Sequence, residues 1–163
     1  MPLVGRKENS FMNETDERFM REALALASEA AENGEVPVGA VVVRSGMIIG
    51  RGRNRREERK NALAHAELEA INQACGKLGG WRLPECTLYV TLEPCPMCAG
   101  AVINSRIGRT VIALRDAASG SFGSVINLNS YPLNHKCATE YGILEDESRV
   151  LMRGFFEKLR KKR

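Results

Sequence analysis

Residues 87–98 read TLYVTLEPCPMC, and this stretch decides the fold that we expect for the chain. The run Thr87–Thr91 is rich in β-branched and aromatic residues, which favours a buried strand. Pro94 and Pro96 follow at once, and because proline tolerates the first helical position, we expect a helix that continues to Ser105. The stretch therefore predicts a strand that leads directly into a helix, with two cysteines at the helix start.

Outward from this stretch, helical and extended patterns alternate along the chain. We expect helices over about 15–33, over 64–78 and from 145 onward, and strands at 40–43, 47–49 and 110–114. Segment 115–137 is rich in Gly, Ser and Asn, which favours a loop with one short helical piece. The last helix should bury a stripe formed by Val150, Leu151, Phe155 and Leu159. This order predicts an α/β protein, a three-layer α/β/α sandwich with a mixed central sheet.

Length and composition indicate one soluble domain. The chain has 163 residues, 44% of them hydrophobic, and lacks an apolar run of the roughly 20 residues that a membrane helix needs. We expect residues 1–14 to be a disordered lead-in without a secretory signal, and residues 15–163 to form the domain. Five cysteines, an odd number, favour free or metal-bound thiols and hence the cytoplasm. The net charge of +4 is compatible with a nucleic-acid partner.

Four residues at two predicted helix starts suggest a catalytic zinc site. His65 opens one helix, and Cys95 and Cys98 open another; two sulfurs and one nitrogen are ligands that select zinc, one ion per chain. Three protein ligands leave the fourth position to solvent, which is typical of a catalytic rather than a structural site. Glu67, in the same first turn as His65, is the candidate catalytic residue because its carboxylate could carry a proton between water and substrate.

Several motifs resemble one family, the bacterial tRNA-specific adenosine deaminases of the zinc cytidine and deoxycytidylate deaminase superfamily. They are His-Ala-Glu at 65–67, Pro-Cys-Pro-Met-Cys at 94–98, Glu-Val-Pro-Val-Gly-Ala at 35–40, Gly-Arg-Asn-Arg at 52–55 and Ser-Arg-Ile-Gly-Arg at 105–109. The resemblance covers roughly residues 16–157. One departure is Ala62-Leu63, where the family often has Pro-Thr, and it touches no expected ligand.

The resemblance implies a cytidine-deaminase-like fold, a homodimer, and hydrolysis of adenosine to inosine at the wobble position of a tRNA anticodon stem-loop. His65, Cys95 and Cys98 would hold Zn²⁺ and Glu67 would shuttle the proton. The implied substrate-binding residues are Asn54 at the extruded nucleoside, Asp116 at the neighbouring nucleotide, and Val36.

Basic residues suggest further contacts to the RNA backbone. We expect such contacts from Arg53 and Arg55 in the loop at 51–62 and from Arg160 and Lys161 at the C-terminus. The loop could instead be an ordinary solvated segment, and the C-terminal charges could complement a helix dipole.

Three alternatives stay open on the sequence alone. The zinc could be structural, completed by Cys75, Cys86, Cys137 or His135. The enzyme could deaminate a free base or nucleoside of the guanine or cytidine type, since guanine deaminases share the His-Ala-Glu and Pro-Cys-Pro-Met-Cys motifs. The chain could also be a non-catalytic, zinc-stabilised RNA-binding domain.

Overall fold

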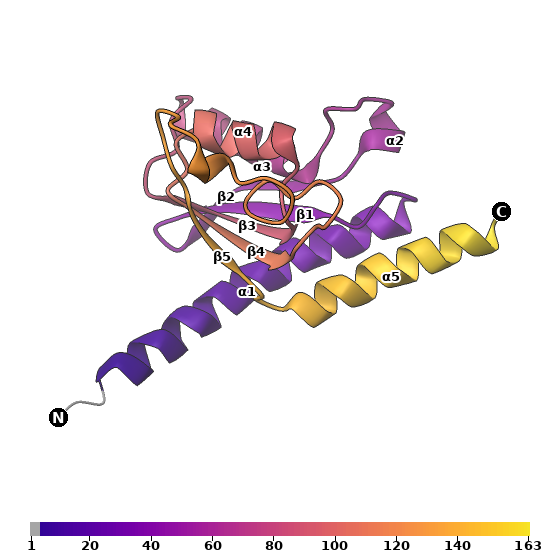
Figure 1. The fold of residues 1–163 in the computed structure, drawn as a ribbon, viewed down its shortest axis with the longest axis horizontal. Coiled ribbons are helices and arrows are strands. Elements are labelled where there is room, and N and C mark those ends of the chain that lie inside the picture. Colours follow the sequence, from indigo (N-terminus) through magenta and orange to yellow (C-terminus); the bar gives the residue numbers. More distant parts are fainter. Residues whose placement is uncertain (1–3) are drawn as a thin grey trace.

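The strands of the described residues form a single mixed sheet between two layers of helices (Figure 1). The computed structural model describes residues 4–163, with side chains from residue 14 onward. The elements are α1 (Val4–Glu32), β1 (Gly39–Arg44), β2 (Met47–Arg53), α2 (Arg56–Arg59), α3 (Ala66–Leu78), β3 (Cys86–Leu92), α4 (Pro96–Asn104), β4 (Arg109–Leu114), the 3-10 helix η1 (Leu128–Ser130), β5 (Ala138–Tyr141) and α5 (Glu145–Lys161).

The sheet order is β2-β1-β3-β4-β5. β1 pairs antiparallel with β2 and with β3, whereas β3, β4 and β5 run parallel, so the expected mixed sheet is confirmed. Ser45 and Gly46 both have positive φ, as a two-residue hairpin turn of type I′ requires, and they join β1 to β2 as predicted. The carboxyl ends of β2, β3 and β4 therefore meet at one edge of the sheet.

Successive side chains along each strand point to opposite faces of the sheet, so the hydrophobic core has two parts, one on each face. Val42, Leu88 and Val90 face the layer of α3 and α4, while Val41 and Tyr89 face α1 and α5. Figure 1 shows these two helical layers above and below the sheet. No helix in the described part of the chain combines the length and the apolar character that a membrane span requires.

The two ends of the chain differ from the prediction. α1 begins at Val4 rather than near Thr15. Part of the segment 1–14, expected to be a disordered lead-in, is thus helical in the structure, and residues 1–3 lie outside the described residues. At the other end, the expected buried stripe of α5 is also wrong, because Val150 is 69% exposed and Leu159 is 40% exposed. Only the beginning of α5 is held against the sheet, where Ser148 Oγ donates to the carbonyl of Thr91 at 2.6 Å.

The remaining differences are local. The expected basic loop contains the end of β2 and the single turn α2. The expected loop over 115–137 contains η1 as its short helical piece, and the chain then forms β5, a strand that the sequence pattern did not predict.

Close backbone contact fixes α3 against β2. A Cβ atom added at Gly52 would lie 2.1 Å from the carbonyl oxygen of Ala66, and one at Gly50 would lie 2.1 Å from that of Ala70. The facing helix positions Ala66, Ala70 and Ala74 are fully buried. The first turn of α3, which carries the candidate site, is therefore positioned by direct contact between main chains.

This contact leads to a stability prediction for Gly52→Ala. The added methyl group has no space, so we expect the free energy of unfolding to fall by about 1–3 kcal/mol in urea denaturation, the usual cost of overpacking. The control is Gly76→Ala in α3, the helix that packs on Gly52, because an added Cβ at Gly76 meets nothing within 4 Å. That variant should gain about 0.5–1 kcal/mol, because alanine is the better helix former. Equal effects of the two substitutions would contradict this account.

Candidate active site

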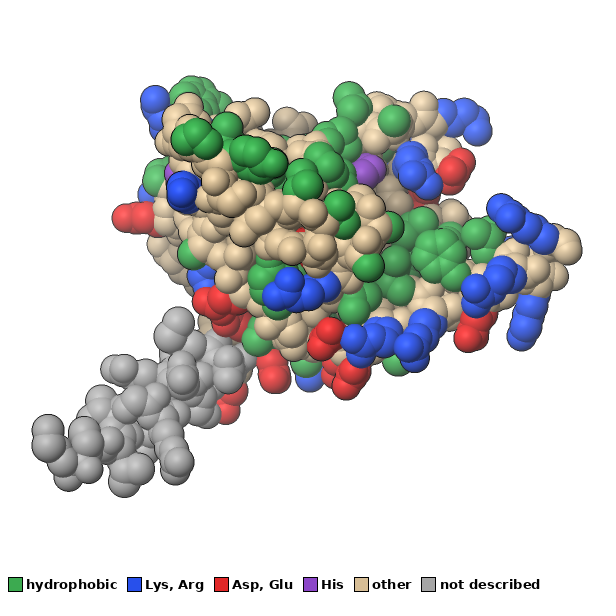
Figure 2. All heavy atoms as spheres, viewed as in Figure 1, with side chains coloured by type: hydrophobic (Ala, Val, Ile, Leu, Met, Phe, Trp, Pro, Cys, Tyr) green, Lys and Arg blue, Asp and Glu red, His purple; other side chains and the backbone are tan. Residues whose placement is uncertain are grey.

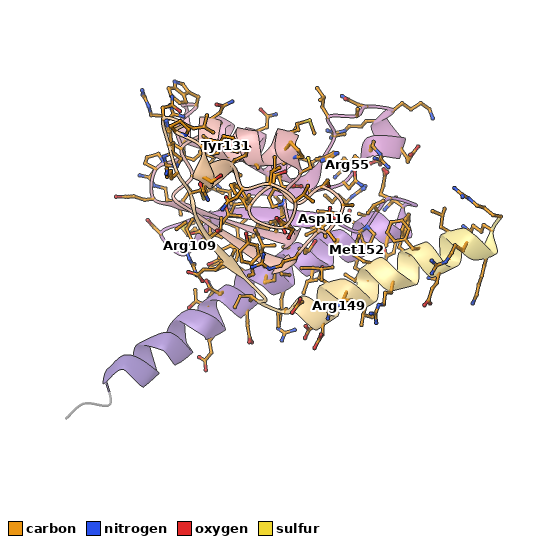
Figure 3. All side chains as sticks on the ribbon, viewed as in Figure 1. Arg55, Arg109, Asp116, Tyr131, Arg149 and Met152 are labelled. Atoms are coloured by element: carbon orange, nitrogen blue, oxygen red, sulfur yellow. The ribbon has the colours of Figure 1, made fainter. Side chains whose placement is uncertain are left out.

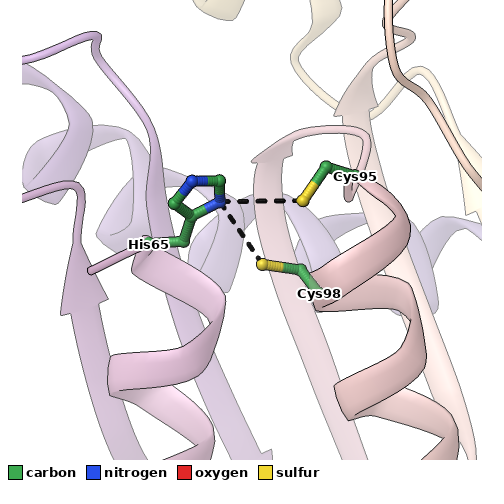
Figure 4. Close-up of side chains that lie close together, drawn as sticks. All are labelled: His65, Cys95 and Cys98. Carbon is green, nitrogen blue, oxygen red and sulfur yellow. Dashed lines mark hydrogen bonds between the residues drawn. The ribbon is translucent and has the colours of Figure 1, made fainter. Parts of the chain in front are cut away.

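Three side chains from two helix starts converge at the edge of the sheet where β2, β3 and β4 end. His65 is the N-cap residue of α3, Cys95 is the N-cap residue of α4, and Cys98 lies in the first turn of α4. Neither N-cap side chain makes a capping hydrogen bond to the main chain of its helix. Instead, His65 Nδ1 faces both sulfurs, 3.7 Å from Cys95 Sγ and 3.5 Å from Cys98 Sγ (Figure 4).

These distances fit a tetrahedral zinc site. Typical zinc bonds of about 2.3 Å to sulfur and 2.0–2.1 Å to nitrogen imply a nitrogen-to-sulfur separation of about 3.6 Å around the ion. The three ligand atoms all lie within 4.8 Å of one another. In the described part of the chain no fourth Cys, His, Asp or Glu joins this group, so a structural site completed by Cys75, Cys86, Cys137 or His135 is not supported.

Mutual hydrogen bonding prepares one of the thiols for a metal. The hydrogen bond from Cys98, supported by His65, lowers the pKa of Cys95 to about 4 despite its partial burial. The pKa of Cys98 is raised by the same hydrogen bond and by burial, and the pKa of His65 is raised mainly by its hydrogen bond to Cys95. A cation bound between the two sulfurs would favour the thiolate form of both cysteines.

Glu67 lies in the first turn of α3, two residues after His65, and is only 4% exposed. Burial raises the pKa of its carboxyl group, while the charge of His65 opposes this shift. The side chain nevertheless lines the pocket that opens at the ligand cluster. A carboxyl group that is shielded from bulk water but open to a bound ligand is suited to proton transfer.

The pocket is bounded by the segments that follow the ends of three strands. Its empty space, including the open mouth, is about 530 Å³. The predicted residues Val36, Asn54 and Asp116 line it, together with His65, Glu67 and Cys95. The other lining residues, which were not predicted as site residues, are Val38, Arg56, Ala66, Leu92, Glu93 and Ser119. Glu93 could have been predicted from its position, because it directly follows β3 as Asn54 follows β2, and ligands commonly bind at such strand ends.

Hydrogen bonds hold one wall of this pocket in place. The amide of Asn54 donates to the carbonyl of Val36 at 3.2 Å and accepts from the main-chain N–H of Arg56 at 3.1 Å. The buried carboxylate of Glu35 accepts from the N–H groups of Glu57 at 2.8 Å and Glu58 at 3.1 Å. In this structure, the side chain of Asn54 supports the wall that a ligand would touch.

Two of the expected RNA-backbone residues are neutralised within the protein. Arg53 is buried, at 4% exposure, and lies 3.2 Å from a carboxylate oxygen of Glu58. Arg55, beside α2 in Figure 3, forms ion pairs with Glu69 at 2.9 Å and with Glu58 at 3.0 Å. The structure therefore does not support phosphate contacts from Arg53, whose guanidinium group is enclosed, or from Arg55, whose charge is already paired.

Arg56 differs from its neighbours. It is exposed, it lines the pocket, and among the described residues no acidic side chain forms an ion pair with it. Arg160 and Lys161 are exposed at the end of α5. Figure 2 shows basic side chains gathered there, on the side of the molecule that carries α2.

The comparison with known proteins agrees with this geometry. Residues 14–160 match the family described as MafB19-like deaminase. A tRNA-specific adenosine deaminase of Bacillus subtilis is 48% identical, with 91% of this chain and 92% of the relative covered.

Two solved structures resemble the fold. The first, from a study of A-to-I editing by tRNA:A34 deaminases at the wobble position, has a TM-score of 0.80 at 42% identity and covers 82% of this chain and 98% of that one. The second, a guanine deaminase of Nitrosomonas europaea, has a TM-score of 0.74 at 28% identity and covers 85% and 83%. The cytidine-deaminase-like fold is confirmed. The chain belongs to the MafB19-like deaminase family and is one of the tRNA-specific adenosine deaminases.

Proposed function

We propose that this protein converts the wobble adenosine of a tRNA anticodon loop to inosine, with one zinc ion per chain as cofactor. One observation carries the proposal: the His65–Cys95–Cys98 cluster and the buried Glu67 meet at the same pocket. The 48% identity to a tRNA-specific adenosine deaminase supports RNA as the substrate.

The reaction is hydrolysis: a bond from oxygen to C6 of adenine forms, the bond from C6 to the amino nitrogen breaks, and ammonia leaves. Zinc, when bound, would supply the Lewis acidity that activates water at neutral pH. Glu67 takes the proton from the attacking water. It gives that proton to the adjacent ring nitrogen, then takes the proton of the new C6 hydroxyl and passes it to the departing amine. Because the carboxyl group is buried, its proton passes between the reactants rather than to bulk solvent.

The pocket walls receive the nucleotide on two sides. Val36 and Asn54 are proposed to contact the extruded nucleoside, and Asp116, in the loop after β4, to contact its neighbour (Figure 3). The backbone of a loop nucleotide is anionic, so the unpaired guanidinium group of Arg56 is proposed to bind a phosphate at the mouth. Arg160 and Lys161 are proposed to bind phosphates farther along the RNA.

Arg56→Ala tests the role of the pocket mouth. We expect KM for an anticodon stem-loop to rise about 10-fold, the effect of losing one hydrogen bond to a charged group. The slope of affinity against salt should fall by about one, as expected when one phosphate contact is lost. Arg59→Ala is the matched control, because it removes the same charge from α2 at a residue already 3.6 Å from Glu69. Similar losses in the two variants would show that only total charge matters.

The proposed function is tested by assaying inosine and ammonia on an anticodon stem-loop, free adenosine, free guanine and free cytidine. We expect inosine on the RNA and one zinc per chain. The similarity to a guanine deaminase makes free guanine the main competitor. Activity on a free base with none on the RNA would refute the proposal. RNA binding without any turnover would instead favour a zinc-stabilised binding domain.

The homodimer and the cytoplasmic location also belong to this proposal. Apolar side chains that a second copy could cover are exposed on both sides of η1, at Val125 before it and at Tyr131 and Leu133 after it. Sedimentation of the zinc-loaded protein distinguishes a dimer from a monomer.

A further inference from the structure

A buried carboxylate, which the mechanism does not use, lies in the wall of the pocket. Glu93 directly follows β3, is 2% exposed, and stands two residues before Cys95. No Lys, Arg or His forms a salt bridge with it in the described part of the chain. An unpaired buried charge is costly unless hydrogen bonds compensate it, so its partners indicate why it is there.

All the hydrogen bonds to this carboxylate come from one loop, residues 116–124, here called the pocket loop. Asp116 N donates to Oε1 at 3.2 Å, and the N–H groups of Phe122 and Ser124 donate to Oε2, each at 3.1 Å. The hydroxyl of Ser124 also donates to Oε1. Donors at the beginning and at the end of the pocket loop therefore meet on a single side chain.

The loop closes tightly around the carboxylate. A Cβ added at Gly120 would lie 2.5 Å from Oε2 of Glu93 and 2.5 Å from the carbonyl oxygen of Asp116. Ser121 N donates to the carbonyl of Pro94 at 2.9 Å, so the loop is also tied to the segment that leads to Cys95. The pocket loop is thus wrapped around Glu93, with no space for a side chain at its middle.

This arrangement connects the ligand cluster to the opposite wall of the pocket. The segment 92–95 supplies Leu92, Glu93 and Cys95 to the lining, and the pocket loop supplies Asp116 and Ser119. The side chain of Asp116 accepts from Ala118 N and Ser119 Oγ, each at 2.9 Å, so its orientation follows the local turn. Fixing that turn on Glu93 fixes the distance between Asp116 and the ligand cluster.

We propose that Glu93 is a positioning residue that holds the pocket loop at a fixed place beside the ligand cluster, so that Asp116 selects the nucleotide beside the target adenosine. The inference rests on the proposed function, since it takes RNA as the ligand. Glu93 is not a member of the ligand cluster, and its carboxylate oxygens accept hydrogen bonds from the pocket loop. Its effect should therefore appear in binding and in nucleotide preference rather than in the chemical step.

Glu93→Gln tests the proposal, because the new amide NH₂ faces main-chain N–H groups that need an acceptor. We expect zinc content and circular dichroism to stay unchanged. KM for the stem-loop should rise roughly 10- to 100-fold, the range for losing a hydrogen bond to a charged group, while kcat changes little. The preference for the natural neighbouring nucleotide, measured against stem-loops with that nucleotide replaced, should weaken.

Further variants keep the test decisive if Glu93→Gln does not fold. Ser124→Ala removes one of the four hydrogen bonds and should cause a smaller change in the same direction. Gly120→Ala displaces the loop without altering any charge and should weaken the same preference. Ser130→Ala is the matched control, because that hydroxyl bonds only to the carbonyl of Asn127 at 2.6 Å, outside the pocket loop.

The outcomes separate this inference from the proposed function. Wild-type KM and unchanged preference in Glu93→Gln and Gly120→Ala, with an active wild-type enzyme, would overturn the positioning role. A loss of kcat together with zinc would also overturn it, since Glu93 would then serve the ligand cluster. A wild-type protein without activity on RNA would refute the proposed function itself.

Discussion

Replacing Glu67 by Gln should reduce kcat for inosine formation by roughly 10²- to 10⁴-fold, the usual contribution of a positioned acid or base. Gln has nearly the same shape but cannot carry a proton between water and adenine. KM for the stem-loop should stay within a few fold of the wild-type value, because the pocket walls are unchanged. Single-turnover measurement of inosine, with a saturating excess of enzyme over RNA, isolates this chemical step.

Two measurements accompany this variant. Metal analysis should still give one zinc per chain, since Glu67 is not a member of the ligand cluster. Thermal unfolding should give a melting temperature no lower than that of the wild type, because the substitution removes a carboxylate that is buried at 4% exposure. Full activity in Glu67→Gln would exclude this carboxyl group as the proton carrier and would reopen the choice of catalytic residue.

The second large effect is expected from Cys98→Ala, which should abolish both zinc binding and activity. Cys98 is fully buried and faces His65 Nδ1 at 3.5 Å, so no other side chain can take its place. Loss of an outer-shell partner alone costs up to about 100-fold in metal affinity, and loss of a ligand should exceed that. Competition with a chromogenic chelator measures the affinity.

Cys75→Ser is the control for this experiment. Cys75 lies on α3, the same helix that His65 opens, and it is a free thiol outside the ligand cluster. This variant should bind one zinc per chain and retain full activity. If Cys98→Ala bound zinc as tightly as the control, a metal site at the two helix starts would be untenable.

Local signals in the sequence were sufficient to predict the two helices, α3 and α4, whose first turns form the site. Pro96 stands at the first helical position of α4, and Gly79 ends α3 in the left-handed conformation, as the residue types predicted. Such signals act within a few residues of the chain, so they can be interpreted without the rest of the fold. This is why His65, Cys95 and Cys98 could be identified before the structure.

Features that depend on distant parts of the chain could not be predicted in this way. β5 is a four-residue, partly exposed edge strand, and its pairing partner Arg109 lies 29 positions before Ala138. The apolar pattern of α5 identifies an amphipathic helix but does not reveal that its second half extends past the sheet. The positive charges of Arg53 and Arg55 are likewise evident from the sequence, but their ion pairs with Glu58 and Glu69 are evident only from the structure.

The pocket loop illustrates the same limit. Glu93 directly precedes the Pro-Cys-Pro-Met-Cys motif, yet its partners come from residues 23 to 31 positions later. Only the parallel pairing of β3 with β4 brings the two segments to the same edge of the sheet.

The contact between β2 and α3 has a consequence for the tolerance of this enzyme to mutation. Gly50 and Gly52 are buried, and the main chain of α3 packs directly on their main chain. Inactivating substitutions should therefore also arise outside the pocket lining, at places where a single methyl group tilts the helix. The outward side of that helix, occupied by Asn72 and Gln73, should accept most residues without loss of turnover.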